Sequence, residues 1–552
     1  MKKTFICLLS IILIISTLPS FTASAVSGTP ISTADEFMAM DPAGEYYLAA
    51  DITLSRTYYK PFEGTLNGNG KTLTISEPIF EDFSGKVEDL TIEGKVIKTD
   101  EDASAFALTS SKGFEAINCT NNARVTVMGY AKYASGFVGT CYNAAVKFTN
   151  CTNNGAIYLD STADEKPRAG GFGAIIDELK MDSCVNNGNI YLNGNLGIAG
   201  GLVAKVALNA GNHDLIIYNS VNNGNVTVED TYIAKDGTPG TGAADAGGLV
   251  GNIGIKDNTA DYQIWGCKNN GNIEGLYRTG GLIGYCYATQ AAAFIDMQFC
   301  INTGNVTYGR MQKPDDKLYY DYASAFVAYT NSAFTTIKYC IDTGNISKRE
   351  GAISEFDFNI FVGNSSADAS QYEVKAVYML NKEQYKYFSY NGNDFFSSIA
   401  NTYEFEPYEG VIATSLEDLA SGKVAYEINQ AAVNDRYTSA IEKGFAFYQK
   451  LGEDNLPSVD PSRGWVVLSG DTYANGENVP ETTQPEATKS CQDDILPVTT
   501  QAPALTASPE TTSSPETEPP AQTGCGGFSC SALLIAIICG AGLRKKLLVA
   551  SY

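Results

Sequence analysis

One stretch of the sequence brings carboxylates and phenol side chains close together. Its members are Tyr308, Asp315, Asp316, Tyr319, Tyr320, Asp321 and Tyr322. Aromatic rings offer flat apolar faces, and carboxylates accept hydrogen bonds, so this mixture suits contacts with carbohydrates or proteins. We therefore predict that the stretch belongs to a binding surface.

Catalytic chemistry finds little support in the residue types. The single histidine, His213, lies among polar neighbours in an apparent insertion, which favours a surface loop over a general base. A Ser–His–Asp or Cys–His site would have to use this residue. No catalytic residue is predicted.

Metal binding is not expected either. The acidic cluster of Asp160, Asp164 and Glu165 could offer oxygen ligands to Ca²⁺, as could the stretch around Asp315. Neither cluster follows the calcium-loop pattern, and a solvated acidic loop explains both. The chain also has no C-x-x-C motif for zinc. We expect no cofactor.

A repeated phrase must position all these residues. The sequence GGLVG at 247–251 is followed by CKNNGNI from Cys267, and GGLIG at 280–284 is followed by CINTGNV from Cys300. The Cys phrase begins at Cys119, Cys151, Cys184, Cys267, Cys300 and Cys340, and a seventh copy begins at Ser220. Repeated phrases with spacers of varying length indicate one scaffold with inserted loops.

Each repeat reads as strand, turn and strand. In 267–273 an apolar residue at each end flanks a polar turn, and Asn270-Gly271 supplies residues that readily adopt positive φ. Residues 113–351 show no sustained helical periodicity. Short parallel strands without crossover helices predict an all-β solenoid, with Leu, Cys and Ile stacked inward and Asn stacked at the turns.

The repeats carry a family resemblance. GGLVG followed by C-x-N-x-G-x-[IV] resembles the GLUG-type repeat of bacterial surface proteins, which are similar to the filamentous-haemagglutinin class. The resemblance covers about residues 100–365. It implies a right-handed parallel β-helix. The departures are Ser220 and the phrase SAFVA at 324–328, which loses its glycines.

The cysteines are predicted to form a structural ladder. Six of the 13 cysteines occupy one repeat position, whereas a disulfide framework would join different positions. We predict buried free thiols at the six anchors. The sequence leaves the pairing of Cys141 and Cys286 open.

The flanks differ from the repeats in composition. A basic start, an apolar run and Ala23-Ser24-Ala25 indicate a secretory signal. The tail from Thr523 resembles Cys-containing anchors, with an apolar run before Arg544-Lys545-Lys546. The predicted parts are a signal (1–25), an N-terminal cap with first coils (26–100), β-helix repeats (101–370), a small α+β capping module (371–470), a disordered Thr/Pro/Glu-rich stalk (471–523) and a membrane anchor or sorting signal (524–552).

These parts predict an extracellular bacterial protein held at the cell surface by its C-terminal segment. The net charge of −24 argues against nucleic acid as a partner. The expected partners are surface glycans or proteins of a host or of microbes, and the membrane through the anchor. An adhesive or binding role is the main hypothesis. The alternatives are a polysaccharide lyase or hydrolase with a site built from insertion loops, and a passive structural surface protein.

Overall fold

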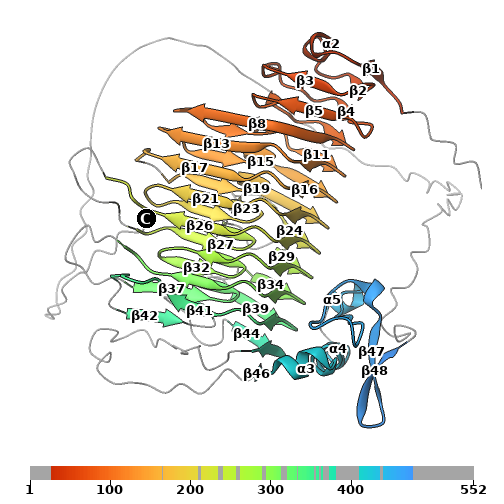
Figure 1. The fold of residues 1–552 in the computed structure, drawn as a ribbon, viewed down its shortest axis with the longest axis vertical. Helices are drawn as coiled ribbons and strands as arrows, with labels where there is room; N and C mark the ends of the chain where they lie inside the picture. The colour runs from red at the N-terminus through yellow and green to blue at the C-terminus, as the bar shows by residue number, and fades with distance from the viewer. Residues whose placement is uncertain are drawn as a thin grey trace, which may run out of the picture. The chain divides into compact units, whose positions relative to one another are not determined.

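The protein is a right-handed parallel β-helix, seen from the side in Figure 1. The computed structural model describes residues 26–476 except 165, 209–212, 234–239, 241, 257–261, 289–293, 312–319, 332–333, 354–355, 360–361, 365–371, 381–409 and 436–438. The predicted signal, nearly all of the stalk and the anchor lie outside these residues. Within the described part, no helix is both long and apolar enough to span a bilayer.

Three sheets run along the stack, and every strand in them pairs in parallel with the equivalent strand of the next coil. Sheet 1 has eight strands: β9 (Ala103–Ser104), β14 (Tyr133–Ser135), β18 (Arg168–Gly170), β22 (Ile198–Gly200), β27 (Asp245–Gly247), β32 (Arg278–Gly280), β37 (Tyr320–Ser324) and β42 (Phe356–Asn359).

Sheet 2 has 19 strands: β1 (Thr29–Ile31), β2 (Glu45–Leu48), β4 (Thr65–Asn67), β6 (Phe80–Asp82), β7 (Lys86–Glu88), β10 (Ala107–Ser110), β11 (Phe114–Ile117), β15 (Val138–Thr149), β19 (Gly173–Asp182), β23 (Val203–Leu208), β24 (Leu215–Tyr218), β28 (Val250–Ile255), β29 (Tyr262–Trp265), β33 (Ile283–Ala288), β34 (Phe294–Gln298), β38 (Val327–Asn331), β39 (Phe334–Lys338), β43 (Val362–Asn364) and β44 (Tyr372–Lys375).

Sheet 3 comprises β3 (Ile52–Leu54), β5 (Thr72–Ile75), β8 (Thr91–Thr99), β12 (Thr120–Asn121), β13 (Arg124–Gly129), β16 (Thr152–Asn153), β17 (Ile157–Ser161), β20 (Val185–Asn186), β21 (Ile190–Asn193), β25 (Val221–Asn222), β26 (Val226–Glu229), β30 (Lys268–Asn269), β31 (Ile273–Glu274), β35 (Ile301–Asn302), β36 (Val306–Tyr308), β40 (Ile341–Asp342), β41 (Ile346–Lys348), β45 (Val377–Met379) and β46 (Val411–Ala413).

The two halves of the repeat phrase meet inside each coil. The glycine half turns the chain from sheet 1 into sheet 2, with Leu249 and Leu282 fully buried. A Cβ at Gly248 would lie 2.0 Å from the Gly281 carbonyl oxygen of the next coil and 2.5 Å from Cγ of Asn269, which belongs to the Cys half of the same repeat. The glycine is therefore needed because both the next coil and the buried asparagine approach it closely.

That asparagine belongs to a ladder inside the stack. Its members are Asn121, Asn153, Asn186, Asn222, Asn269, Asn302 and Asp342. Each Nδ2 donates to the side-chain oxygen of the next member, at 2.7–2.9 Å. Each Asn also donates to a backbone carbonyl two residues later. The ladder satisfies amides that have no access to water.

The cysteines follow a neighbouring column, as the ladder prediction requires. The residues after each anchor pair in register from Thr120 to Ile341, so the anchors stack coil on coil. All six anchors are buried free thiols, and so are Cys141 and Cys286. Ser220 keeps its place in the column because its hydroxyl donates to the Tyr218 carbonyl at 2.8 Å.

The residue before each anchor has a left-handed backbone. In the earlier coils it is Asn118, Asn150, Ser183 or Asn219, whereas in later coils it is Phe299 or Tyr339. Asparagine tolerates this conformation, and an aromatic residue there is strained. The aromatic pair is fully buried, so contacts with another part of the chain must hold it in place.

A small C-terminal module supplies those contacts. It contains α3 (Leu416–Ala420), α4 (Lys423–Val433), α5 (Ser439–Glu442), a 3₁₀ turn (Pro461–Arg463) and the antiparallel hairpin β47 (Trp465–Ser469) with β48 (Thr472–Gly476). Trp465 and Tyr448 are buried in this module with ring centroids 5.7 Å apart.

The module packs against the flank of the later coils. The Phe447 ring lies 5.6 Å from the Phe299 ring, and the Phe445 ring lies 5.6 Å from that of Trp265. The Tyr339 hydroxyl donates to Asp435 at 2.5 Å. The module therefore contacts the side of the stack, where the aromatic corner residues offer an apolar surface.

At the other end, α2 (Ala34–Met38) begins at Thr33, whose hydroxyl accepts from the Glu36 amide while Glu36 returns the bond in a capping box. The helix buries Phe37 against Tyr58 and Phe80 of the first coils.

Candidate functional site

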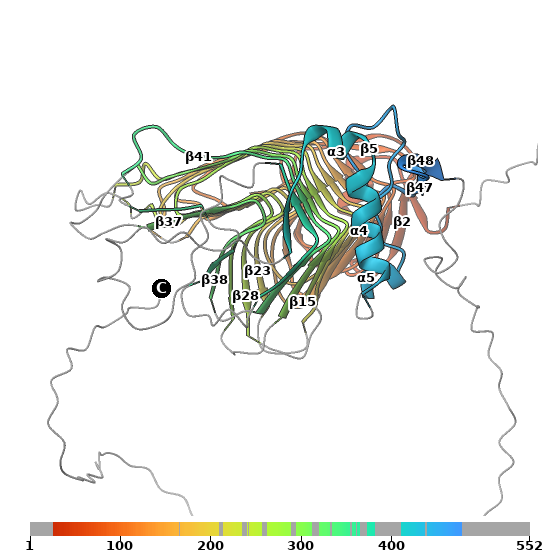
Figure 2. The same cartoon turned by 90° about the horizontal axis from the view of Figure 1, so that it is seen from below.

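Two outward-facing columns meet where sheet 1 turns into sheet 2. Viewed along the stack, β37 and β38 lie at an angle to each other and leave a concave side (Figure 2). Seven successive coils each contribute one residue from each sheet, seven positions apart in the sequence. The pairs are Asp102/Thr109, Tyr133/Thr140, Arg168/Ile175, Ile198/Lys205, Asp245/Asn252, Arg278/Tyr285 and Tyr322/Tyr329. We call this surface the concave face.

Contacts confirm that the paired residues face each other. Asn252 Nδ2 donates to Asp245 at 2.8 Å, and the Arg278 guanidinium lies 3.6 Å from the centroid of the Tyr285 ring. The Tyr322 and Tyr329 rings are 4.6 Å apart. Each contact joins two residues of one coil across the corner between sheet 1 and sheet 2.

Ion pairs join side chains in the later coils, at and beside the concave face. Arg278 Nε lies 2.6 Å from Asp245, and Arg310 Nε lies 2.8 Å from Asp321. The Tyr277 ring lies against both guanidinium groups, at 4.6 Å and 4.1 Å. Buried pairs of this kind satisfy each other and fix local geometry. The ion pairs therefore stabilise this end of the concave face.

The structure separates the residues of the predicted binding stretch. Tyr308 lies in the hydrophobic core at 1% exposure, so it cannot contribute to a surface. Asp321 is fully buried in the ion pair with Arg310. Tyr322 is half-buried on the concave face, as is its neighbour Tyr277. Asp315, Asp316 and Tyr319 lie outside the described residues, and of Tyr320 only the strand position in β37 is described.

The other residues weighed for chemistry have ordinary partners. His213 Nδ1 lies 3.3 Å from Glu178. Asp160 accepts a hydrogen bond from Asn193, and Asp164 accepts one from Tyr232. Among the described residues, no group of three or more His, Cys, Asp or Glu is placed to hold a metal ion. Glu165 lies outside them.

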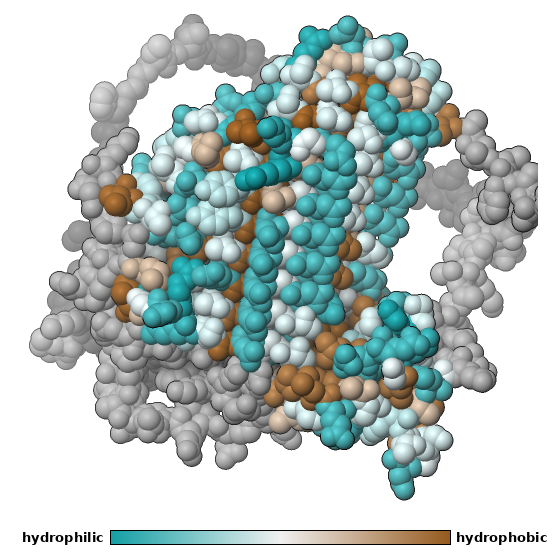
Figure 3. Space-filling view, viewed as in Figure 1, coloured by the Kyte–Doolittle hydropathy of each residue, from teal (hydrophilic) through white to brown (hydrophobic). Residues whose placement is uncertain are grey.

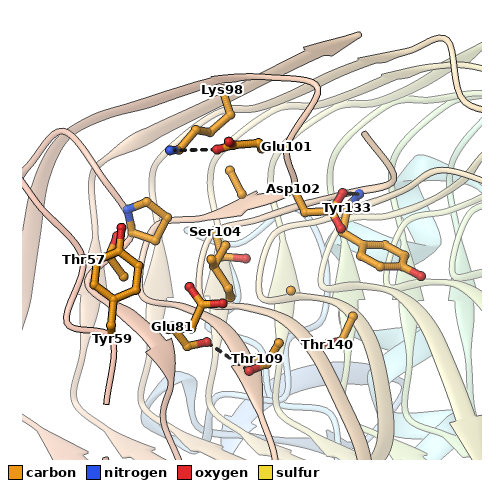
Figure 4. A pocket seen from close by; sticks show the side chains of 14 residues that line it. Thr57, Tyr59, Glu81, Lys98, Glu101, Asp102, Ser104, Thr109, Tyr133 and Thr140 are labelled. Atoms are coloured by element: carbon orange, nitrogen blue, oxygen red, sulfur yellow. Dashed lines mark hydrogen bonds and ion pairs between the residues drawn. The ribbon is translucent and has the colours of Figure 1, made fainter. Parts of the chain in front are cut away.

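An open cleft lies at the N-terminal end of the concave face. It encloses about 510 Å³ and is drawn in Figure 4. Strands β6, β8, β9, β10, β14 and β15 and the loop after β3 contribute to it. The lining residues are Thr57, Tyr59, Pro78, Glu81, Lys98, Glu101, Asp102, Ala103, Ser104, Leu108, Thr109, Tyr133, Gly139 and Thr140.

The cleft combines aromatic sides with polar groups between them. Tyr59 and Tyr133 stand on opposite sides in Figure 4, and Glu81 lies between them. Tyr59 is 72% exposed, although it is a large aromatic residue. Rings at both sides of a polar cleft suit a ligand with flat apolar faces and hydroxyl edges.

Ion pairs set the charge of the cleft. Lys98 Nζ lies 2.7 Å from Glu77 and 3.1 Å from Glu101, and the bond to Glu77 raises the lysine pKa. Asp102 accepts from the backbone amides of Lys132 and Tyr133. Glu81 is exposed and is the carboxylate best placed to accept bonds from a ligand.

Comparisons with known proteins add little to this geometry. No family model matches the chain, and no curated protein matches it. A solved structure titled "IgA1 Protease" is similar at 17% identity and a TM-score of 0.33, over 55% of this chain. The similar region spans 21% of that protein, so a small part of its length is represented here. A similarity this low carries no argument about function.

Sequence reasoning missed both the cleft and the paired columns. The cleft draws on residues from 57 to 140, which no single motif contains. The spacing of seven residues across each glycine phrase is visible in the sequence, as in Arg278 and Tyr285. Its meaning depends on knowing that the phrase is the corner of the coil.

Proposed function

We propose that the protein is a cell-surface β-helix that binds a glycan on its concave face, with the N-terminal cleft as the main contact. The observation that carries the proposal is the exposed ring of Tyr59, which lies on the opposite side of a polar cleft of about 510 Å³ from Tyr133. Sugars offer apolar C–H faces to rings and hydroxyl groups to carboxylates.

The surface location rests on sequence features. The predicted signal at 1–25, the Thr/Pro/Glu-rich stretch and the apolar tail with its basic cluster support export and anchoring. The repeat phrase, which resembles the GLUG type, supports a bacterial surface protein. Cell fractionation followed by mass spectrometry of the mature termini tests this part; a full-length cytoplasmic product would contradict it.

Glycan binding is tested with the full chain on an array of oligosaccharides. Tyr59→Ala and Tyr133→Ala should each weaken binding about two- to tenfold, since an aromatic contact contributes about 0.5–1.5 kcal/mol. Tyr130→Ala is the matched control, because Tyr130 is 52% exposed and does not line the cleft. Equal losses for Tyr130→Ala and Tyr59→Ala would contradict the cleft assignment.

The same experiment separates the two alternatives. Release of reducing ends that Glu81→Gln abolishes would replace the binding proposal with a hydrolase or lyase. Wild-type protein that binds no glycan and no cell surface would leave a passive structural role. The observation that favours binding over catalysis is the exposure of Glu81, because the sites that perform acid–base chemistry usually exclude water from the reacting groups.

A further inference from the structure

The cleft at the N-terminal end of the concave face carries more negative than positive charge. Among the described residues that line it, Glu81, Glu101 and Asp102 supply carboxylates, and Lys98 is the one cation. Glu77, which does not line the cleft, lies 2.7 Å from the Lys98 ammonium nitrogen. The single positive charge of the cleft is therefore shared among several carboxylates.

The lining carboxylates differ in how far the protein itself satisfies them. Glu101 lies 3.1 Å from Lys98 Nζ, and Asp102 accepts bonds from two backbone amides. Within the part of the chain that the structure describes, the Glu81 carboxylate has no hydrogen bond or ion pair. Only the backbone carbonyl of Glu81 is engaged, by the Thr109 hydroxyl at 2.9 Å. Glu81 is therefore the carboxylate whose oxygens remain for a ligand.

No cation of the protein is placed to neutralise Glu81. Lys98 would have to leave its two existing carboxylate partners, and the bonds to them raise its pKa. Lys60, Lys132 and Arg168 come next to lining residues in the sequence or the stack, but none of them lines the cleft. A positive group from outside would pair with Glu81 without breaking any bond of the protein.

An aromatic face on the rim favours the same kind of group. The face of a tyrosine ring is negative and attracts cations. The Tyr133 ring already has the Arg168 guanidinium 5.8 Å from its centroid. On the opposite side of the cleft (Figure 4), Tyr59 is 72% exposed, and no ring or cation of the described residues contacts it. Tyr59 and Glu81 thus both suit a ligand that joins a positive charge to an apolar face.

We propose that the cleft binds a sugar with a free, protonated amino group, which places its ammonium against Glu81 and its ring on Tyr59. The proposal rests on the glycan-binding function above and specifies its ligand class. An N-acetylated sugar brings a neutral amide in place of the cation, and an acidic sugar is repelled by the lining carboxylates. The net charge of −24 attracts cationic ligands at long range.

The direct test compares two forms of one oligosaccharide. A β-1,4-linked glucosamine oligosaccharide and its fully N-acetylated form are titrated into the full chain by calorimetry. A mildly acidic buffer keeps the amine protonated and the carboxylates ionised. The free-amine form should bind about tenfold more tightly, because an exposed charge pair and a cation–π contact act together. Equal affinities for the two forms would overturn the proposal.

A variant of Glu81 locates the preference in the cleft. Glu81→Gln should weaken binding of the free-amine form about three- to fivefold, the size of an exposed charge pair, and leave the N-acetylated form unchanged. Glu45→Gln is the matched control, because Glu45 is exposed on β2, does not line the cleft and removes the same charge. It should change neither affinity. Unchanged binding of the free-amine form by Glu81→Gln would refute the site.

A variant of Lys98 should act in the opposite direction. Lys98→Met removes the cation of the cleft and releases Glu101 for the ligand, so the free-amine form should bind about threefold more tightly. A gain of affinity cannot arise from partial unfolding, which makes this readout independent of stability. Weaker binding by Lys98→Met protein with the circular dichroism of the wild type would contradict the charge argument.

The outcomes distinguish this inference from the proposed function. If both forms of the oligosaccharide bind equally and Tyr59→Ala weakens both, glycan binding stands and the preference for an amino sugar is refuted. If neither form binds, the glycan-binding function fails together with its amino-sugar form. Binding of an oligolysine peptide in that case, lost in Glu81→Gln, would replace both with a protein partner.

Discussion

The buried ladders and the concave face obey different rules, although the same coils build both. In the asparagine ladder six successive coils carry the same side chain, because each amide can donate to one neighbouring coil and accept from the other. On the concave face the residues change from coil to coil: Arg278 contacts Tyr285 of its own coil and forms an ion pair with Asp245, an unlike residue of the preceding coil. Self-complementary amides require repetition, whereas the contacts of the concave face allow variation. A ligand site can therefore develop on the concave face without disturbing the stack. The exposed surface carries hydrophilic columns along the stack as well (Figure 3).

The largest expected effect comes from breaking the buried ladder. Asn186 is fully buried, donates to Asn222 and Gly188 at 2.8 Å each, and accepts from Asn153 at 2.7 Å. Asn186→Ala leaves these groups without partners and should cost about 4 kcal/mol of unfolding free energy. Chemical denaturation measures it. Asn187→Ala is the control, since Asn187 is exposed in an outer ladder, and it should cost less than about 1 kcal/mol.

The second-largest effect is expected for Leu282, whose side chain points into the core at the corner of the coil. Leu282 is fully buried in the glycine phrase between Arg278 and Tyr285. Leu282→Ala should cost about 3 kcal/mol, from lost burial and the cavity left behind. Leu468→Ala is the control because Leu468 is 49% exposed. An unchanged melting temperature for Leu282→Ala would show that this column does not support the stack.

Lys205→Met should raise the unfolding free energy, whereas the two variants above lower it. Removing a poorly hydrated cation should stabilise the free protein at pH 7 by about 1–2 kcal/mol, after allowance for its partial exposure. Because the folded-state pKa is lowered to about 8, the unfolded chain binds more protons between pH 8 and the ordinary lysine pKa, and wild-type stability should rise with pH through that window. The variant should lack this rise. Destabilisation by Lys205→Met would mean that the lysine serves packing.

The smallest effect is expected at Ser220, which occupies a position in the thiol column where the other coils have cysteine. Ser220 donates to the Tyr218 carbonyl at 2.8 Å and accepts from the Cys184 amide at 3.2 Å. Ser220→Cys exchanges these bonds for weaker ones and adds apolar volume, so the unfolding free energy should change by less than about 1 kcal/mol. Calorimetry measures the shift in Tm. A loss above about 2 kcal/mol would show that the hydroxyl is essential there.

Sequence patterns predicted the features that repeat. The thiol column, the buried Leu282 and the stacked asparagines all follow from phrases that return in each coil. Tyr308 was predicted at the surface and lies in the core, since strand alternation turns it inward. Features that do not repeat can be predicted only once the fold is known. The cleft joins Tyr59 to Tyr133 across several coils, and the C-terminal module reaches Phe299 through contacts that no local pattern encodes.

The ladder also has a direction. Its amides all donate toward the C-terminal coils, and the last rung is Asp342, whose side-chain oxygen accepts from Asn302 at 2.9 Å. The positive ends of the aligned amide dipoles thus point at a carboxyl group, as the N–H groups at the start of a helix point at an acidic cap. Duplicating a whole coil before Asn302 would preserve every bond of this ladder. In the coil after Asp342 the partner position is Met379, which carries no amide, so the ladder ends where the stack itself continues.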